Sequence, residues 1–66
     1  MINNAHQLQV TLQQMQHLFA VLTDLKETVL PHGPRLFAVL AEAPVEDLER
    51  LREEVARFLD QLQPVA

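Results

Sequence analysis

The stretch LQVTLQQMQHLFAVLTDLKETV, residues 8–29, decides the fold of this chain. Steps of three and four residues select a row of seven positions, all apolar except Thr11: Leu8, Thr11, Met15, Leu18, Leu22, Leu25 and Val29. This spacing is typical of one face of an amphipathic helix and does not fit a β-strand, whose side chains alternate. Leu12 and Phe19 widen the apolar face on one side. We therefore expect a long helix over residues 4–30, about 40 Å in length.

Asparagine residues precede this helix and provide candidate caps. The side chain of Asn3 or Asn4 can accept a hydrogen bond from an amide of the first helical turn. Gln7 follows Asn4 by three residues, which resembles a capping box.

The end of the first helix is predicted at Pro31, because proline disfavours the α conformation of the residue before it. A turn follows, in which Gly33 is free to adopt a positive φ. Pro34 suits the first position of the next helix.

Pro44 predicts a second break, which gives a short middle helix over 34–42 and a third helix over 44–63. The third segment repeats the three-four spacing at Val45, Leu48, Leu51, Val55, Phe58 and Leu62, and Pro64 is expected to close it. Short connections make neighbouring helices antiparallel. The predicted fold is an all-α, antiparallel helical hairpin with a short middle helix at the bend.

The small size of the chain favours association with a second copy. Its 66 residues form one domain at most, 1–66. Domains of this size bury only about 60% of their unfolded surface, and one core rarely contributes more than about 3–5 kcal/mol. The chain has no cysteine, so disulfides and thiolate metal sites are excluded. We expect two hairpins to form a dimeric helical bundle, a homodimer.

The expected interface consists of the apolar positions of the helical seams. Aromatic residues often dominate protein contacts, so Phe19, Phe37 and Phe58 are the leading candidates. The full set of predicted interface residues is Leu8, Met15, Leu18, Phe19, Leu22, Leu25, Phe37, Leu51, Val55, Phe58 and Leu62.

The sequence contains no arrangement typical of a catalytic or metal site. His6, His17 and His32 lack the four-residue spacing that places two imidazoles on one helical face. The chain has no serine or cysteine nucleophile, and its one glycine excludes a glycine-rich phosphate loop. We expect neither an enzyme nor a bound cofactor or metal.

The charge pattern argues against nucleic-acid and membrane partners. The net charge is −4, and Arg50, Arg52 and Arg57 are interleaved with glutamates in pairs such as Glu46–Arg50 and Glu53–Arg57. No run approaches the 18 apolar residues of a membrane span, and no secretion signal opens the chain. We expect a cytoplasmic protein.

Several segments resemble a group of small bacterial helical proteins. They are Ile2-Asn3-Asn4, Gln7-Leu8-Gln9-Val10-Thr11, Pro34-Arg35-Leu36-Phe37 and the stretch from Leu48 to Leu59. The pattern is similar to the helical segment that precedes the helix-turn-helix in some antitoxins of the host-inhibition-of-growth type. No helix-turn-helix follows Leu62, so we do not expect operator binding. The resemblance implies a helical module that pairs with itself or with a partner protein.

The sequence therefore favours a non-catalytic module for protein interaction or oligomerisation. The alternative is a small antitoxin-like or regulatory protein that binds and masks a partner protein.

Overall fold

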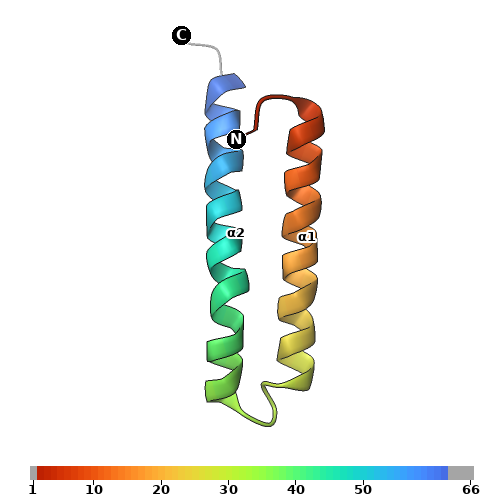
Figure 1. Ribbon diagram of the computed structural model, residues 1–66, viewed down its shortest axis with the longest axis vertical. Helices are drawn as coiled ribbons and strands as arrows, with labels where there is room; N and C mark the ends of the chain where they lie inside the picture. The colour runs from red at the N-terminus through yellow and green to blue at the C-terminus, as the bar shows by residue number, and fades with distance from the viewer. Residues whose placement is uncertain (1, 63–66) are drawn as a thin grey trace.

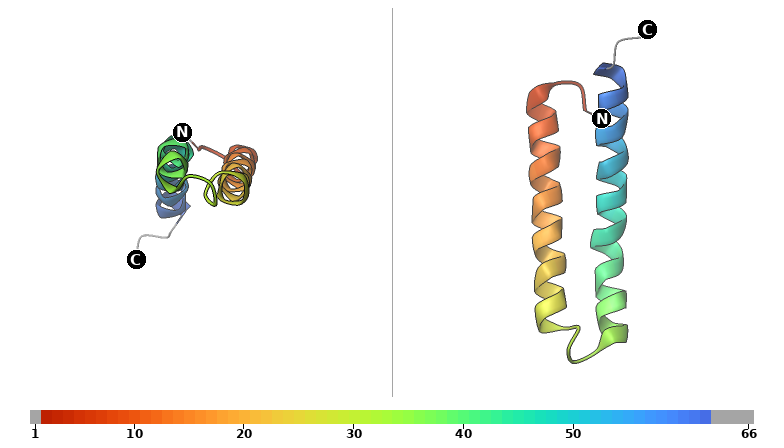
Figure 2. Two further views of the ribbon diagram at one scale, coloured as in Figure 1. Left: turned by 90° about the horizontal axis from the view of Figure 1, so that it is seen from below. Right: turned by 180° about the vertical axis from the view of Figure 1, so that it is seen from behind.

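The computed structural model describes residues 2–62 and contains two long helices packed side by side as a hairpin (Figure 1). Helix α1 spans Ala5–Thr28 and helix α2 spans Pro34–Leu62. The molecule measures 51 × 20 × 16 Å. Seen from below, the described part of the chain is a single layer of two helices, and the segment before α1 crosses one of its two faces (Figure 2). The predicted all-α helical hairpin is confirmed.

Helix α1 begins at the predicted cap. The side chain of Asn4 accepts a hydrogen bond from the amide of Gln7 at 2.9 Å. The side chain of Gln7 in turn accepts from the amide of Asn3 at 2.6 Å. Two amides at the start of the chain are therefore satisfied reciprocally, as in a capping box shifted by one residue.

Helix α1 ends two residues earlier than the predicted range 4–30. Its last residue is Thr28, and the amide of the C-cap Val29 donates to the carbonyl of Leu25 at 2.9 Å. The chain leaves the helix ahead of Pro31, because proline restricts the residue before it.

The turn does not use the conformational freedom of its glycine. No described residue has a positive φ, and Gly33 is no exception. The amides of His32 and Gly33 both donate to the carbonyl of Val29, at 3.0 and 2.9 Å, and close the turn with ordinary backbone angles. The carbonyl of Gly33 accepts from the amide of Phe37 at 2.9 Å, which places Gly33 at the N-cap of α2.

The separate middle helix over 34–42 is absent, and its prediction is wrong. Helix α2 runs without interruption through Pro44 to Leu62. A proline inside a helix removes one backbone hydrogen bond and crowds the preceding turn. The row of residues facing α1 nevertheless keeps its alternating steps of four and three across the proline, so packing on both sides holds one helix: Phe37, Ala41, Pro44, Leu48, Leu51, Val55 and Phe58. The expected closure at Pro64, with residue 63, lies outside the described residues.

The core is a narrow seam between the two helices. All seven positions of the row predicted in 8–29 are buried or half-buried. On α2, Ala41, Leu51 and Phe58 are buried. Thr11 is the one polar residue buried in the described chain, and its hydroxyl donates to the carbonyl of Gln7 at 3.0 Å. The seam therefore leaves no unsatisfied side chain at this position.

Two positions predicted for the α2 seam are exposed instead. Val45 is displaced by its neighbour Pro44, which occupies the row that faces α1. Leu62 is the last residue of α2. This end of α2 extends beyond the start of α1 at Ala5, so α1 does not cover Leu62 (Figure 1).

The segment before α1 folds back onto α2. Ile2 is only 3% exposed, and it lines a hollow with Phe58 and Arg57 of α2. It also lines a second hollow with Gln7 and Thr11 of α1. Figure 1 shows this segment crossing from the start of α1 to α2. Ile2 therefore joins the two helices at the open end of the hairpin.

Candidate interaction surface

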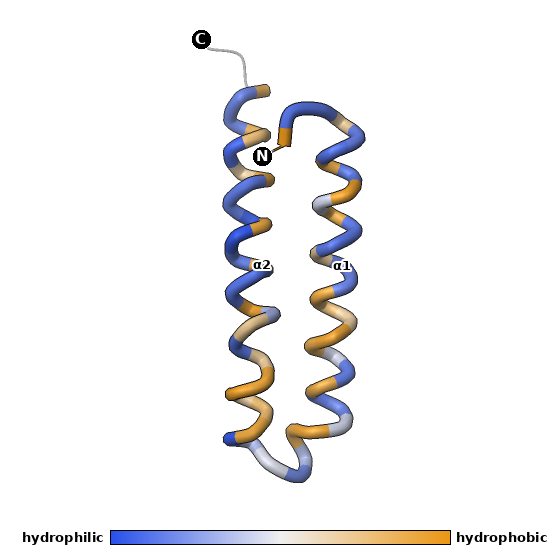
Figure 3. The backbone as a smooth tube through the Cα atoms, in the orientation of Figure 1, coloured by the Kyte–Doolittle hydropathy of each residue, from blue (hydrophilic) through white to orange (hydrophobic). Residues whose placement is uncertain are grey.

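Many large apolar side chains remain exposed on the hairpin. In the described residues they are Val10, Leu12, Phe19, Leu36, Val39, Leu40, Val45, Leu59 and Leu62. Figure 3 shows that apolar residues are concentrated in the half of the hairpin nearer the turn. Single exposed apolar residues are normal on proteins, so their arrangement matters more than their existence.

Four of these residues line one side of the hairpin, which we call the apolar side: Leu12, Phe19, Val45 and Leu59. Each of them directly follows a residue of the seam, and in an antiparallel helix pair such positions flank the same side. Leu12 and Phe19 are seven residues apart, and Val45 and Leu59 are fourteen apart, so each pair shares one helical face. The apolar side therefore extends along much of the hairpin.

A groove of about 440 Å³ lies on the apolar side near the turn. Phe19 from α1 and both Phe37 and Val45 from α2 contribute to its lining. The complete lining is Phe19, Leu22, Thr23, Lys26, Leu30, Phe37, Ala41 and Val45. Lys26 is its one charged residue. A groove with this lining is suited to apolar side chains of another protein segment.

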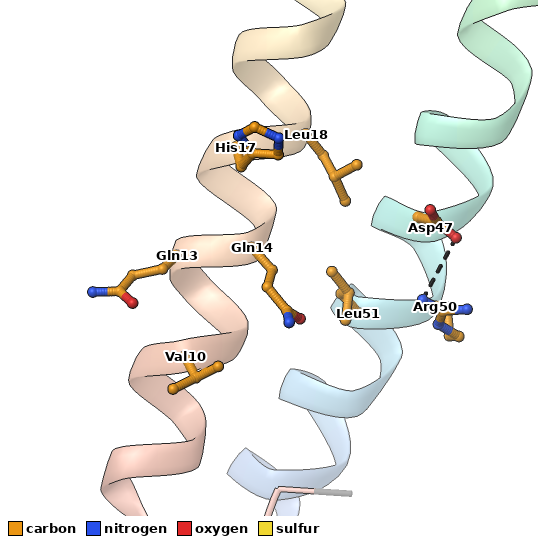
Figure 4. A pocket seen from close by; sticks show the side chains of 8 residues that line it. All are labelled: Val10, Gln13, Gln14, His17, Leu18, Asp47, Arg50 and Leu51. Carbon is orange, nitrogen blue, oxygen red and sulfur yellow. Dashed lines mark ion pairs between the residues drawn. The ribbon is translucent and has the colours of Figure 1, made fainter.

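The opposite side, which we call the polar side, carries glutamine and acidic residues: Gln7, Gln14, Asp47 and Glu54. Figure 4 shows its central hollow, where Gln14 and Leu18 extend from α1 toward Leu51 of α2. Asp47 pairs with Arg50 at 3.5 Å on this side. Ile2 fills the polar side further toward the open end, beside Glu54. Leu40 continues the row of Asp47 and Glu54 toward the turn and is exposed, so the two sides differ in chemistry in the centre and at the open end of the hairpin.

The ion pairs expected along α2 do not form as predicted. Within the described residues Arg50 pairs with Asp47, three residues before it, and not with Glu46. Both side chains are largely exposed, so the pair contributes little to stability.

The hairpin exposes more surface than a compact protein of its mass. Its accessible surface is 5323 Å². A compact monomer of 7.5 kDa exposes about 4,200 Å², so the excess is roughly 1,100 Å². The radius of gyration is 15.2 Å, against about 11 Å for a compact domain of this length. A standard interface buries about 800 Å² on each partner, so the excess is large enough for one.

The predicted interface residues divide into two groups. Nine of the eleven lie in the seam, where the other helix of the same chain covers them: Leu8, Met15, Leu18, Leu22, Leu25, Phe37, Leu51, Val55 and Phe58. Phe19 and Leu62 are exposed. Of the three phenylalanines, Phe19 at 56% exposure is the one most accessible to another protein, and Phe58 at 8% is the least.

Sequence reasoning did not identify Val45 as a surface residue, although the signal was present. The three-four spacing counted from Val45 through Leu48 and Leu51 predicts Val45 in the seam. Reading the four-three row of α2 continuously from Phe37 places Pro44 in the seam and Val45 beside it.

The histidines occupy separate exposed positions at His6, His17 and His32. Among residues 2–62 no group of three histidine, aspartate or glutamate side chains is placed to hold a metal ion. No helix in the described part of the chain combines the length and apolar character needed to cross a membrane.

Comparison of the chain with protein-family models, curated proteins and solved structures gives no match. The arrangement of the hairpin is therefore the basis for a functional proposal.

Proposed function

We propose that this chain is a non-catalytic module for protein interaction and oligomerisation, and that it works as a homodimer. The observation that carries the proposal is the excess of roughly 1,100 Å² of accessible surface over that of a compact monomer. Exposed apolar residues contribute to that surface on both helices.

The energetics of a two-helix protein favour the same conclusion. An unfolded chain of 7.5 kDa exposes about 10,900 Å², so the hairpin buries only about half of that surface, less than the roughly 60% typical of small domains. A single seam between two helices provides little apolar burial for so many ordered residues. A second copy would bury further apolar side chains and stabilise both hairpins.

Sedimentation velocity tests this proposal. The full chain is measured from about 1 to 200 μM, which covers dissociation constants in the micromolar range. We expect the weight-average mass to approach twice 7.5 kDa as the concentration rises. Circular dichroism on the same samples verifies that the chain is helical. A helical chain that stays at 7.5 kDa throughout would contradict the proposal.

A second candidate function is the masking of a different protein, as in a small antitoxin-like regulator. The observation that favours it is the exposure of Leu36, Val39 and Leu40 in the first turns of α2. These residues lie off the apolar side, since the row on that side passes through Val45 and Leu59. A helix that is apolar on all faces is usually covered.

Co-expression tests this second function. The chain is produced together with the product of the reading frame beside its gene, and a stoichiometric complex is expected. Replacement of Val39 by glutamate should weaken that complex while leaving the homodimer in place. Purification of the two products as separate species would contradict masking.

A further inference from the structure

Among the exposed surfaces of the hairpin, the apolar side is the one best suited to a second copy of the same chain. We infer that two hairpins pack through their apolar sides, with the side chains of Leu12, Phe19, Val45 and Leu59 buried between the copies. This inference rests on the proposed function, because it assigns the homodimer to one face.

Continuity with the core is the first argument for this face. The groove between Phe19 and Val45 has Phe37 and Ala41 of the seam in its lining. A side chain placed in the groove would therefore contact the seam itself and extend the core across the interface. Interface centres of this kind are apolar and packed as densely as protein interiors.

The occupation of the opposite side is the second argument. Ile2 fills the open end of the polar side, where it is 3% exposed. Gln14, Asp47 and Arg50 line the central hollow of that side, together with apolar residues such as Leu18 and Leu51. A second copy placed there would have to bury these amides and charges, which is costly without new partners. Within the described residues, the apolar side is not covered by a segment like the one that contains Ile2.

Charge is the third argument. Lys26 lines the groove, and Arg52 lies in the same row of α2 as Val45 and Leu59. Glu42 lies one helical turn before Val45, and Glu49 one turn before Arg52. Both glutamates are exposed and so lie beside this row. The border of the apolar side thus carries both signs of charge, so two copies can meet there without like charges facing each other throughout. A polar border around an apolar centre is the usual anatomy of an interface.

Two valines provide a matched test of this inference. Val10 and Val45 are both 40% exposed in the hairpin, but Val10 lines the polar side and Val45 the apolar side. Because the chain has no cysteine, Val10→Cys and Val45→Cys each introduce a single thiol. The rate at which the thiol reacts with a small maleimide is measured at protein concentrations above and below the dissociation constant of the dimer. Sedimentation gives the mass of the protein at each concentration.

We expect the thiol of the Val45→Cys variant to react about tenfold more slowly in the dimer than after dilution. Dilution dissociates the dimer, and position 45 is then no longer covered by the second copy. The thiol of the Val10→Cys variant should change less than about twofold, since its side stays in solvent. A dimer in which both thiols react alike, or in which the thiol at position 10 is the protected one, would overturn this inference and leave the proposed function standing. A helical monomer at every concentration would overturn both.

A second pair of variants tests the same face by disruption. Phe19→Glu places a carboxylate in the lining of the groove, and Val10→Glu places one on the polar side. We expect Phe19→Glu to weaken dimerisation at least tenfold, which is the measure of a hot-spot residue, while Val10→Glu leaves it within about twofold. Equal effects of the two changes, with both variants helical, would exclude the apolar side as the interface.

Discussion

Ile2 and Phe58 line the same hollow at the open end of the hairpin, although they are separated by nearly the whole chain. They are 3% and 8% exposed. Ile2 is thus part of the core.

We predict that Ile2→Ala lowers the free energy of unfolding by about 2–3 kcal/mol, because it removes a buried aliphatic side chain at a site that joins the two helices. Leu62→Ala is the control, since Leu62 is exposed and its truncation should change stability by less than about 0.5 kcal/mol. Urea unfolding followed by circular dichroism measures both. Equal effects would mean that Ile2 does not hold the hairpin closed.

Phe58 and its neighbour Leu59 should respond in opposite ways to the same substitution. Phe58→Asp puts a charge into the seam, which costs several kcal/mol and exceeds the stability of so small a core. We expect the helical circular dichroism signal to disappear. Leu59→Asp places the charge on the exposed apolar side, so the variant should remain helical and lose association. A helical Phe58→Asp variant would show that the seam is assigned wrongly.

Replacement of Pro44 distinguishes one helix from two. Inside a helix a proline costs about 3 kcal/mol relative to alanine, so Pro44→Ala should raise the free energy of unfolding by about 1–3 kcal/mol after some loss of packing in the seam. If a separate helix began at Pro44, the same change would be neutral or slightly destabilising. Denaturant unfolding of the Pro44→Ala variant distinguishes a continuous helix from a separate helix that begins at Pro44.

Gly33 offers a route to stabilisation. Its φ is not positive, and a Cβ at this position would meet only the Cβ of Leu36, at 3.4 Å. Gly33→Ser should therefore fit, restrict the unfolded chain and supply an N-cap oxygen to α2, with a gain of about 0.5–1 kcal/mol. A loss of stability in thermal unfolding would indicate that the turn needs the glycine.

The sequence predicted the parts of the fold that depend on regular spacing. The row from Leu8 to Val29 faces α2 as expected, and Asn4 caps α1 through the amide of Gln7. These features depend on nearby residues or on regular spacing, so they can be predicted without knowing where the other helix lies.

The errors arose where tertiary packing outweighs a local preference. Pro44 interrupts a helix in isolation, but the row through Ala41 and Leu48 holds it inside α2. The burial of Ile2 depends on a contact with the far end of the chain, which no local pattern reveals. The distinction between Phe58 in the seam and Phe19 on the apolar side likewise requires both helices in place.

The central claim is that a second copy covers surface that one hairpin leaves exposed. The dependence of the thermal unfolding midpoint on protein concentration tests it most directly, because the stability of a dimer follows mass action. For a hundredfold increase in concentration, we expect a rise of roughly 5–10 °C in the midpoint. A midpoint that is the same at both concentrations, in a chain that unfolds cooperatively, would contradict it.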